Sequence, residues 1–434
     1  MSEALIVDPG LRSVAGHHYA AALALTDVLA ARGVSVRVLG SRFATAGALE
    51  GAGARAVFTN NVYSRGPYSA TKFETHVRAT LDGLLASAGP DRRMPDLVIL
   101  PTCDAALAEA VARFLSRAPE EARPPVLAWL LLSRDFARMS APEGPQHPRR
   151  GYAALEAAVG ADRLHVFTET QAMADVYRVE FMHPIAVAPS PAAPIERPLA
   201  EIDETDGPRF SAFGHIVDGK GYELFPDAIA AAAGSRPALR FTIHAAVNAT
   251  SARKSADLLD AIEAAAPGVT VLREELNPAR YATELARADA VMLPYDPRTY
   301  GDRGSGIYNE CEAAGIPVLA TAGCSFAASA IAGGRAVAIA RHDAAALASA
   351  ICDAAERIGD LRAAASAHAK THAAERAAAL NAIVDTALKQ APPNAGWRLR
   401  QGLGFWRARG FQSARALVRF PLMLRATRNA RRIK

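Results

Sequence analysis

The sequence predicts an α/β protein of two Rossmann-like domains, each a doubly wound parallel sheet, which face a central cleft. Short apolar runs alternate with longer alanine-rich segments along most of the 434 residues. These runs are apolar throughout rather than at every second position, which is typical of strands covered by helices on both faces. A proline-rich, acidic stretch divides the alternation into two similar series, so we expect two such domains.

The first series predicts an N-terminal domain over residues 1–190. The opening segment, MSEALIVDPG, has no basic region and no long apolar run. It is therefore interpreted as the first strand of the domain rather than as a secretory signal. The strands are expected at 4–8, 34–40, 96–102, 126–132, 164–170 and 185–190, and the helices at 17–32, 70–88, 104–117 and 151–160.

A linker is expected at 191–208, because residues 189–208 contain five prolines and five acidic residues and continue neither element. The second series then predicts a C-terminal domain over 209–388, which ends in a largely helical segment. In open α/β sheets, ligands bind at the carboxyl ends of the strands, so each domain is expected to hold one ligand in the cleft that the two share. The strands of this series are expected at 209–214, 239–246, 269–272, 290–295, 317–321 and 336–340.

A glycine-rich loop, DPRTYGDRGSG (296–306), joins one of these strands to a helix expected from about Gly306 to Ala314. Gly315 can adopt the positive φ that ends a helix, and Pro317 prevents its continuation. Glycines let a ligand approach the backbone, and the amides of a helix N-terminus favour an anion such as a diphosphate. The alternative is a plain strand–turn–helix connection without a ligand.

This stretch resembles the C-terminal motif of retaining GT-B glycosyltransferases, especially glycosyltransferase family four. The motif is matched by Asp302, seven residues, Glu310 and then CEAAGIPV. The resemblance implies that Asp302 contacts the donor sugar and that Glu310 binds the ribose hydroxyls of the nucleotide. The family has glutamate where this chain has Asp302. The shorter side chain fits a different donor sugar, a shifted loop or weakened catalysis.

A second segment, FSAFGHIVDGKGYELF (210–225), resembles the family's Gly-Arg-x4-Lys-Gly segment, whose cations neutralise the donor diphosphate. Lys220 and Gly221 match the pattern, whereas His215 replaces the usual arginine. A lysine is a compact charge suited to a phosphate. A histidine can donate a hydrogen bond but is less reliably charged near pH 7. A solvated loop lysine is the alternative interpretation of Lys220.

The third match is the glycine-containing loop after the first strand, which in the family lies against the donor phosphates and the acceptor. Gly16, His17 and His18 stand there at the start of a helix, and an ordinary capped helix with exposed histidines is the alternative. Arg134 follows another strand and is expected to contact the acceptor or a phosphate. Arg303, in the loop 296–306, is expected either to contact phosphate or to be solvated.

The resemblance implies transfer of a sugar from a nucleotide-diphosphate sugar to a glycan or lipid-linked acceptor, with retention. Lys220, Asp302 and His215 would be catalytic. The backbone at Gly304, Ser305, Gly306 and Ile307 would bind the leaving diphosphate. No cofactor or metal is expected, because the chain has no Asp-x-Asp triplet and no recognised zinc-ligand spacing. Two alternatives stay open: a nucleotide-sugar epimerase on the same scaffold, and a catalytically silent protein that binds sugar nucleotides or glycans.

The C-terminal tail, residues 389–434, carries the basic character of the chain. It has twelve Lys and Arg residues and no acidic residue, which leaves 37 basic and 44 acidic residues before it. Arginines interleaved with aromatics favour contact with an anionic membrane surface, and the acidic body disfavours nucleic acid. A tail packed on the body, or disordered, is the alternative. Four scattered cysteines and no apolar stretch of 18 residues favour a cytoplasmic protein, with membrane association at the inner face.

Overall fold

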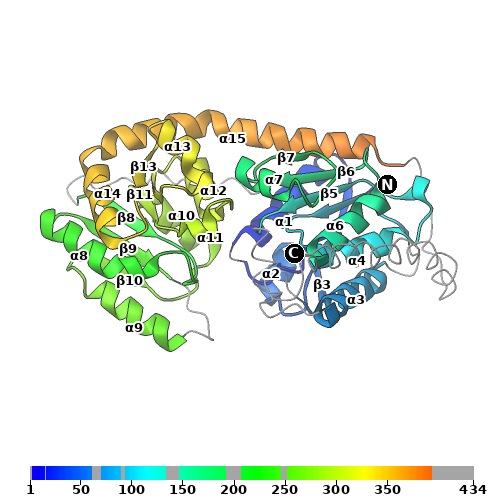
Figure 1. Cartoon of the computed structure of the whole chain (residues 1–434), viewed down its shortest axis with the longest axis horizontal. Coiled ribbons are helices and arrows are strands. Elements are labelled where there is room, and N and C mark those ends of the chain that lie inside the picture. Colours follow the sequence, from blue (N-terminus) through cyan, green and yellow to red (C-terminus); the bar gives the residue numbers. More distant parts are fainter. Residues whose placement is uncertain are drawn as a thin grey trace, which may run out of the picture.

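Two parallel sheets with helices on both faces form two domains that lie side by side (Figure 1). This computed structural model describes residues 2–14, 16–60, 70–88, 93–132, 146–191, 207–245 and 252–392. The predicted α/β class with two Rossmann-like domains is confirmed. Arg134, most of the predicted linker and residues 393–434 of the tail lie outside the described residues.

The N-terminal domain contains a seven-stranded parallel sheet in the order β3-β2-β1-β4-β5-β6-β7. One strand, β3, was not expected from the sequence. It lies at the edge of the sheet and exposes Arg55 and Ala56, so it lacks the continuous apolar run of a buried strand. The strands are β1 (Glu3–Val7), β2 (Ser35–Ser41), β3 (Ala54–Phe58), β4 (Leu97–Leu100), β5 (Val126–Leu130), β6 (Leu164–Thr168) and β7 (Ile185–Val187). The helices are α1 (His17–Ala30), α2 (Ala46–Gly51), α3 (Ala70–Ser87), α4 (Ala105–Leu115), α6 (Gln146–Val159) and α7 (Gln171–Tyr177), with a 3-10 turn at Glu120–Ala122.

The C-terminal domain contains a six-stranded parallel sheet in the order β10-β9-β8-β11-β12-β13. Each of its strands overlaps a strand expected from the sequence. Helix α12 begins at Gly306 and ends at Ala314, as predicted, and Gly315 follows with a φ of 66°. The strands are β8 (Arg209–Ala212), β9 (Arg240–His244), β10 (Val269–Leu272), β11 (Ala290–Leu293), β12 (Val318–Thr321) and β13 (Ala336–Ile339). The helices are α8 (Phe225–Ser235), α9 (Ala252–Glu263), α10 (Pro278–Ala286), α11 (Pro297–Tyr300), α12, α13 (Ala328–Ala332), α14 (Ala344–Glu356) and α15 (Ile358–Lys389), with 3-10 turns at Tyr222–Leu224 and Ser325–Ala327.

Each sheet has a hydrophobic core on both of its faces. In β1, Leu5 and Val7 pack with residues of α3, α4 and α6, whereas Ala4 and Ile6 pack with residues of α1. Successive side chains of a strand point to opposite faces, so a strand covered on both sides needs an apolar residue at every position. Full burial of a large apolar side chain contributes about 1.5–3 kcal/mol, which explains why these runs mark the strands so clearly.

Helix α15 packs on both domains. It has 32 residues and, at 1.5 Å per residue, is about 48 Å long. Leu361 near its start belongs to the C-terminal core, and Val384 near its end belongs to the N-terminal core. Figure 1 shows the helix, in orange, crossing from one domain to the other. Its end therefore packs on the N-terminal sheet, although it lies within the range 209–388 expected for the C-terminal domain. No helix in the described part of the chain is long and apolar enough to cross a membrane.

Candidate functional site between the two domains

The loops at the carboxyl ends of β1, β8 and β11 carry most of the residues singled out from the sequence. In each sheet the strand order reverses beside the first strand, between β1 and β4 and between β8 and β11. Two neighbouring loops diverge at such a switch point and leave room for a ligand. The topology therefore favours a ligand site formed by residues 8–16, 213–221 and 294–305.

Lys220 lies in the loop after β8 and is half-buried. Its Nζ is 5.7 Å from the ring centroid of Tyr295. Gly214 has a φ of 118°, and a Cβ there would stand 2.9 Å from Nζ and 3.2 Å from Cδ1 of Ile307. Glycine thus provides both the backbone conformation and the space for the lysine. Burial, together with the nearby charge of Arg303, lowers the pKa of Lys220 to about 8, and Glu310 opposes the shift.

Glu310 lies on α12, close enough to Lys220 for their charges to interact. Its Oε2 accepts a hydrogen bond from the hydroxyl of Tyr281 on α10. Burial raises the pKa of Glu310 to about 7, against the effects of the Tyr281 hydrogen bond and the charge of Lys220. The structure therefore brings together the two residues on which the predicted nucleotide site depends. Tyr281 was not identified from the sequence, because its contact with Glu310 exists only once α10 and α12 have packed.

Arg303 adds a second cation to this group. Its guanidinium lies 4.6 Å from the ring centroid of Tyr300, a cation–π distance. Its charge contributes to the lowered pKa values of both Lys220 and His17. The sequence left open whether Arg303 is solvated or close to the ligand site, and the structure places it beside Lys220.

His17, in the N-terminal domain, lies next to the start of α12 in the C-terminal domain. A Cβ added at Gly306, the first residue of α12, would be 3.9 Å from the Cβ of His17, the first residue of α1. Burial, and then the charges of His18, Lys220 and Arg303, lower the pKa of His17 well below its usual range. Its imidazole is therefore neutral near pH 7 and can either donate or accept a hydrogen bond.

His18 has a different environment from its neighbour. It is buried, and its Nδ1 lies 2.8 Å from Oδ1 of Asp8, at the end of β1. Its ring also fills the space beside Gly10, where a Cβ would come within 2.1 Å of it. Gly16 forms the N-cap of α1 with a φ of 89°. His17 and His18 are thus neighbours at the start of α1, but His18 contacts Asp8 whereas His17 lies near Gly306.

The start of α12 presents backbone amides to this group. Ser305 caps the helix, because its buried side chain accepts a hydrogen bond from the Tyr308 amide at 3.2 Å. The Ser305 hydroxyl is thus used within the helix, and the backbone of Gly304–Ile307 carries the dipole that favours an anion.

His215 follows β8, where desolvation and the charge of Lys220 lower its pKa, so it is uncharged near neutral pH.

The loop 296–306 and helix α12 are each hydrogen-bonded to the N-terminal domain. Thr170 Oγ1 donates to the backbone carbonyl of Asp302 at 2.5 Å, and Asn309 Nδ2 donates to Oε1 of Glu169 at 2.6 Å. Glu169 also lies against Gly304, where a Cβ would come within 1.9 Å of its Oε2. These contacts were missed from the sequence, although Glu169 and Thr170 directly follow β6, the position from which ligand-site residues project.

In the described part of the chain, the His, Cys, Asp and Glu side chains near Lys220 do not form a set that could hold an ion. Among the described residues, the group whose spacing suits a metal ion is Glu312, His368 and His372, away from Lys220. Glu312 is two residues beyond Glu310 on α12, and residues two apart on a helix do not share a face. All four cysteines are free.

Known protein-family models do not match the chain, and neither do curated proteins. Solved structures do match the chain. A sucrose-phosphate synthase from Thermosynechococcus elongatus is 15% identical over 90% of this chain and 97% of that one, with a TM-score of 0.61. Anabaena HepE, in complex with UDP and glucose, is 15% identical over 90% and 100%, with a TM-score of 0.62. A UDP-GlcNAc 2-epimerase from Neisseria meningitidis, bound to UDP-GlcNAc, is 14% identical over 89% and 100%, with a TM-score of 0.55. With its two parallel-sheet domains and these neighbours, the chain has the GT-B fold.

Proposed function

We propose that the protein is a glycosyltransferase that moves a sugar from a nucleotide-diphosphate sugar to a hydroxyl acceptor, with retention of configuration. The observation that carries the proposal is the grouping of Lys220 and Arg303 beside the N-terminus of α12, although their charges repel one another. A protein keeps two cations together in a half-buried place at an energetic cost, which a bound anion offsets. The fold shared with a structure that contains UDP and glucose supports a nucleotide sugar as that anion.

In the proposed mechanism, the diphosphate of the donor binds between Lys220, Arg303 and the amides of Gly304–Ile307. Glu310 accepts hydrogen bonds from the ribose hydroxyls, as the family resemblance implies. Negative charge grows on the leaving nucleoside diphosphate as the sugar–oxygen bond breaks, and preorganised cations and amides at that position lower the barrier. The acceptor hydroxyl attacks from the same face, and its proton passes to the leaving phosphate.

The remaining parts of the proposal concern the acceptor and the donor sugar. A glycan or lipid-linked acceptor fits a cytoplasmic enzyme whose basic tail, residues 389–434, contacts an anionic membrane. His17 comes from the N-terminal domain, which is expected to bind the acceptor, and its neutral imidazole could orient the attacking hydroxyl. Asp302 is proposed to contact the donor sugar.

A nucleotide-sugar epimerase is the second candidate, because the epimerase with the same fold is bound to UDP-GlcNAc. The two functions differ in what happens to the sugar. A transferase releases a nucleoside diphosphate and needs an acceptor, whereas an epimerase returns a nucleotide sugar of altered configuration. Product analysis of each donor, with and without acceptor, separates the two.

The first test is a thermal-unfolding screen with UDP, GDP and their sugars, followed by turnover assays with each ligand that stabilises the protein. A ligand that binds only the folded state raises the unfolding midpoint. We expect one nucleoside diphosphate and its sugar to do so, and that donor to be consumed. Stabilisation without turnover, across a panel of acceptors, would instead support a binding protein. No stabilisation by any nucleotide at millimolar concentration would contradict the proposed function.

Donor affinity should fall as the pH rises through about 8. The pKa of Lys220 in the free protein is about 8, so the cation that the diphosphate needs is present below this pH and is lost above it. Ionisation of Glu310, whose pKa is about 7, offsets about a factor of two, so the affinity measured by calorimetry should drop roughly five- to tenfold between pH 7 and pH 9. A Lys220→Arg variant is the control, because arginine stays charged throughout this range. If the wild type and the arginine variant show the same pH profile, Lys220 does not bind the diphosphate.

A further inference from the structure

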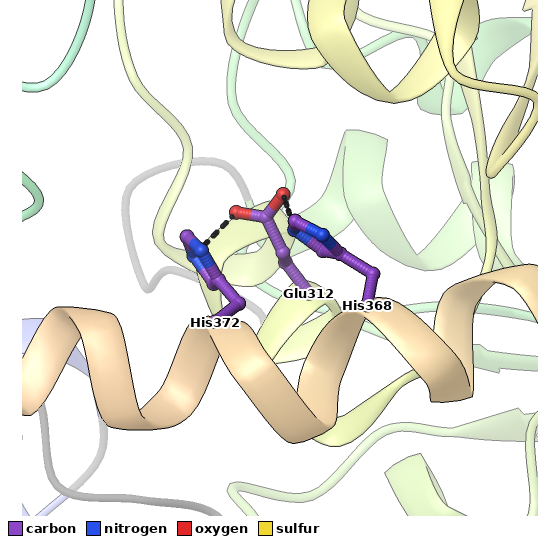
Figure 2. A group of neighbouring side chains, drawn as sticks. All are labelled: Glu312, His368 and His372. Atoms are coloured by element: carbon purple, nitrogen blue, oxygen red, sulfur yellow. Dashed lines mark hydrogen bonds and ion pairs between the residues drawn. The ribbon is translucent and has the colours of Figure 1, made fainter.

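Glu312 faces α15 rather than the nucleotide site. Figure 2 shows its carboxylate between His368 and His372, which project toward it from successive turns of α15. Two histidines four residues apart lie on the same face of a helix, an arrangement found in helical zinc sites. The expectation that the chain lacks a zinc-ligand spacing overlooked this pair of histidines, which the sequence already shows. Their partner Glu312 lies 56 positions before His368 and is identified only by the packing of α12 on α15.

The distances suit a small metal ion. Nε2 of His368 is 3.2 Å from Oε1 of Glu312, and Nε2 of His372 is 3.0 Å from Oε2. One ligand atom from each residue can be chosen so that all three lie within 4.8 Å of one another. Ligands about 2.0–2.1 Å from a tetrahedral ion are about 3.3–3.4 Å apart. A small adjustment of the side chains would thus place all three ligand atoms around one ion.

The two carboxylate oxygens of Glu312 have different partners. Oε1 accepts hydrogen bonds from Tyr308 Oη at 2.8 Å and from Arg335 Nη1 at 3.1 Å. The Tyr308 hydroxyl is uncharged and can orient a metal-binding carboxylate, whereas Arg335 brings a positive charge to it. Oε2 faces His372, whose Nε2 is buried and makes no hydrogen bond of good geometry with any described residue. A buried imidazole nitrogen directed at a carboxylate oxygen, without a well-aligned hydrogen bond, is suited to share a cation with it.

We propose that Glu312, His368 and His372 bind a divalent transition-metal ion, with Zn²⁺ as the best fit. We call them the α12–α15 site. Two imidazoles and one carboxylate are ligands that zinc accepts, and three protein ligands leave one position for water. The ion would connect α15 to α12, the helix that also carries Glu310, and would stabilise the fold rather than take part in sugar transfer.

Arg335 is expected to lower the affinity of the site for a metal ion. Its guanidinium lies against the carboxylate that would bind the ion, so its positive charge opposes a second cation. The exposed fractions of the side chains are 28% for His368, 21% for His372 and 13% for Glu312, so the edge of the site reaches solvent although Nε2 of His372 is buried. The geometry therefore predicts a reversible site that becomes tighter when Arg335 is neutralised.

The test uses untagged full-length protein, stripped with a chelator and titrated with Zn²⁺ in calorimetry and thermal-unfolding experiments. We expect the wild type to bind Zn²⁺ at this site and its unfolding midpoint to rise by a few degrees. His368→Gln and His372→Gln should each weaken that binding by more than about tenfold, since even an outer partner of a zinc ligand changes affinity 10–100-fold. Arg335→Met should bind Zn²⁺ more tightly than the wild type.

His183→Gln, in the N-terminal domain, is the matched control and should bind like the wild type. Circular dichroism before the titration shows whether each variant is folded. The proposal is overturned if the wild type gains no stability from Zn²⁺. It is equally overturned if the His368→Gln/His372→Gln double variant gains as much as the wild type, or if Arg335→Met weakens the binding. Because the readout is metal binding, these outcomes do not depend on the proposed sugar transfer.

Discussion

Replacing Lys220 with alanine should lower turnover of the donor by about 100-fold, the cost typical of removing one preorganised group from a developing negative charge. Lys220 is half-buried beside Arg303 and the start of α12, where the proposed leaving group gains its charge. Because this interaction strengthens as the sugar–oxygen bond breaks, kcat should fall more than KM rises. Steady-state kinetics with the donor found in the nucleotide screen measure both constants.

The fold should survive this substitution. A lysine whose pKa is lowered by burial and by a second cation destabilises the folded protein when it is charged. Its removal should leave the unfolding midpoint unchanged or raise it, so activity and stability should move in opposite directions. Lys370→Ala, an exposed position on α15, is the matched control and should keep full activity. Full activity in the Lys220→Ala variant would rule out the proposed diphosphate site.

Replacing Glu310 with glutamine should weaken donor binding by about 10–100-fold. Hydrogen bonds to a charged group contribute roughly 1.5–3 kcal/mol, and the amide of glutamine replaces one acceptor oxygen with a donor. Glu310 is held by the Tyr281 hydroxyl and interacts with Lys220, so its carboxylate has a defined place beside the diphosphate site. The ribose is bound in both the ground state and the transition state, so the effect should appear mainly in KM. Kinetics and direct calorimetric titration measure it.

A double-mutant cycle with Lys220→Met sharpens this prediction. Residues whose charges interact show non-additive effects, so the double variant should lose less than the two single variants together. Glu223→Gln, exposed beside the loop that carries Lys220, is the control and should leave KM unchanged. An unchanged KM in the Glu310→Gln variant would contradict the role that the resemblance assigns to this residue.

The sequence predicted much of the fold because local signals agree with the packing. Strands buried on both faces, such as β1, are continuous apolar runs, and α12 ends at Gly315 for a reason visible in the sequence. Strand β3 lacks this signal because it is an edge strand. The proposed nucleotide site was found through two segments of distinctive composition, around Lys220 and around Glu310.

Contacts between segments distant in the sequence were harder to predict. Nothing in the sequence distinguishes His17 from His18. In the structure, His18 contacts Asp8, whereas His17 lies against Gly306 at the start of α12. Tyr281 and Glu169 acquire their contacts with α12 only when separate elements dock. The α12–α15 site was missed for the same reason. Residues within a segment of distinctive composition can thus be predicted, whereas contacts made across helices and domains need the tertiary structure.

The continuous helix α15 constrains how the protein can open to admit a large substrate. Leu361 and Val384 anchor it in separate cores, and some residues between them, such as Lys370, are exposed. Any separation of the two domains that leaves both anchors in place must therefore bend or twist α15. A proteolytic cut near Lys370 would remove this constraint, so that direct contacts such as the one between Thr170 and Asp302 would have to hold the two domains together.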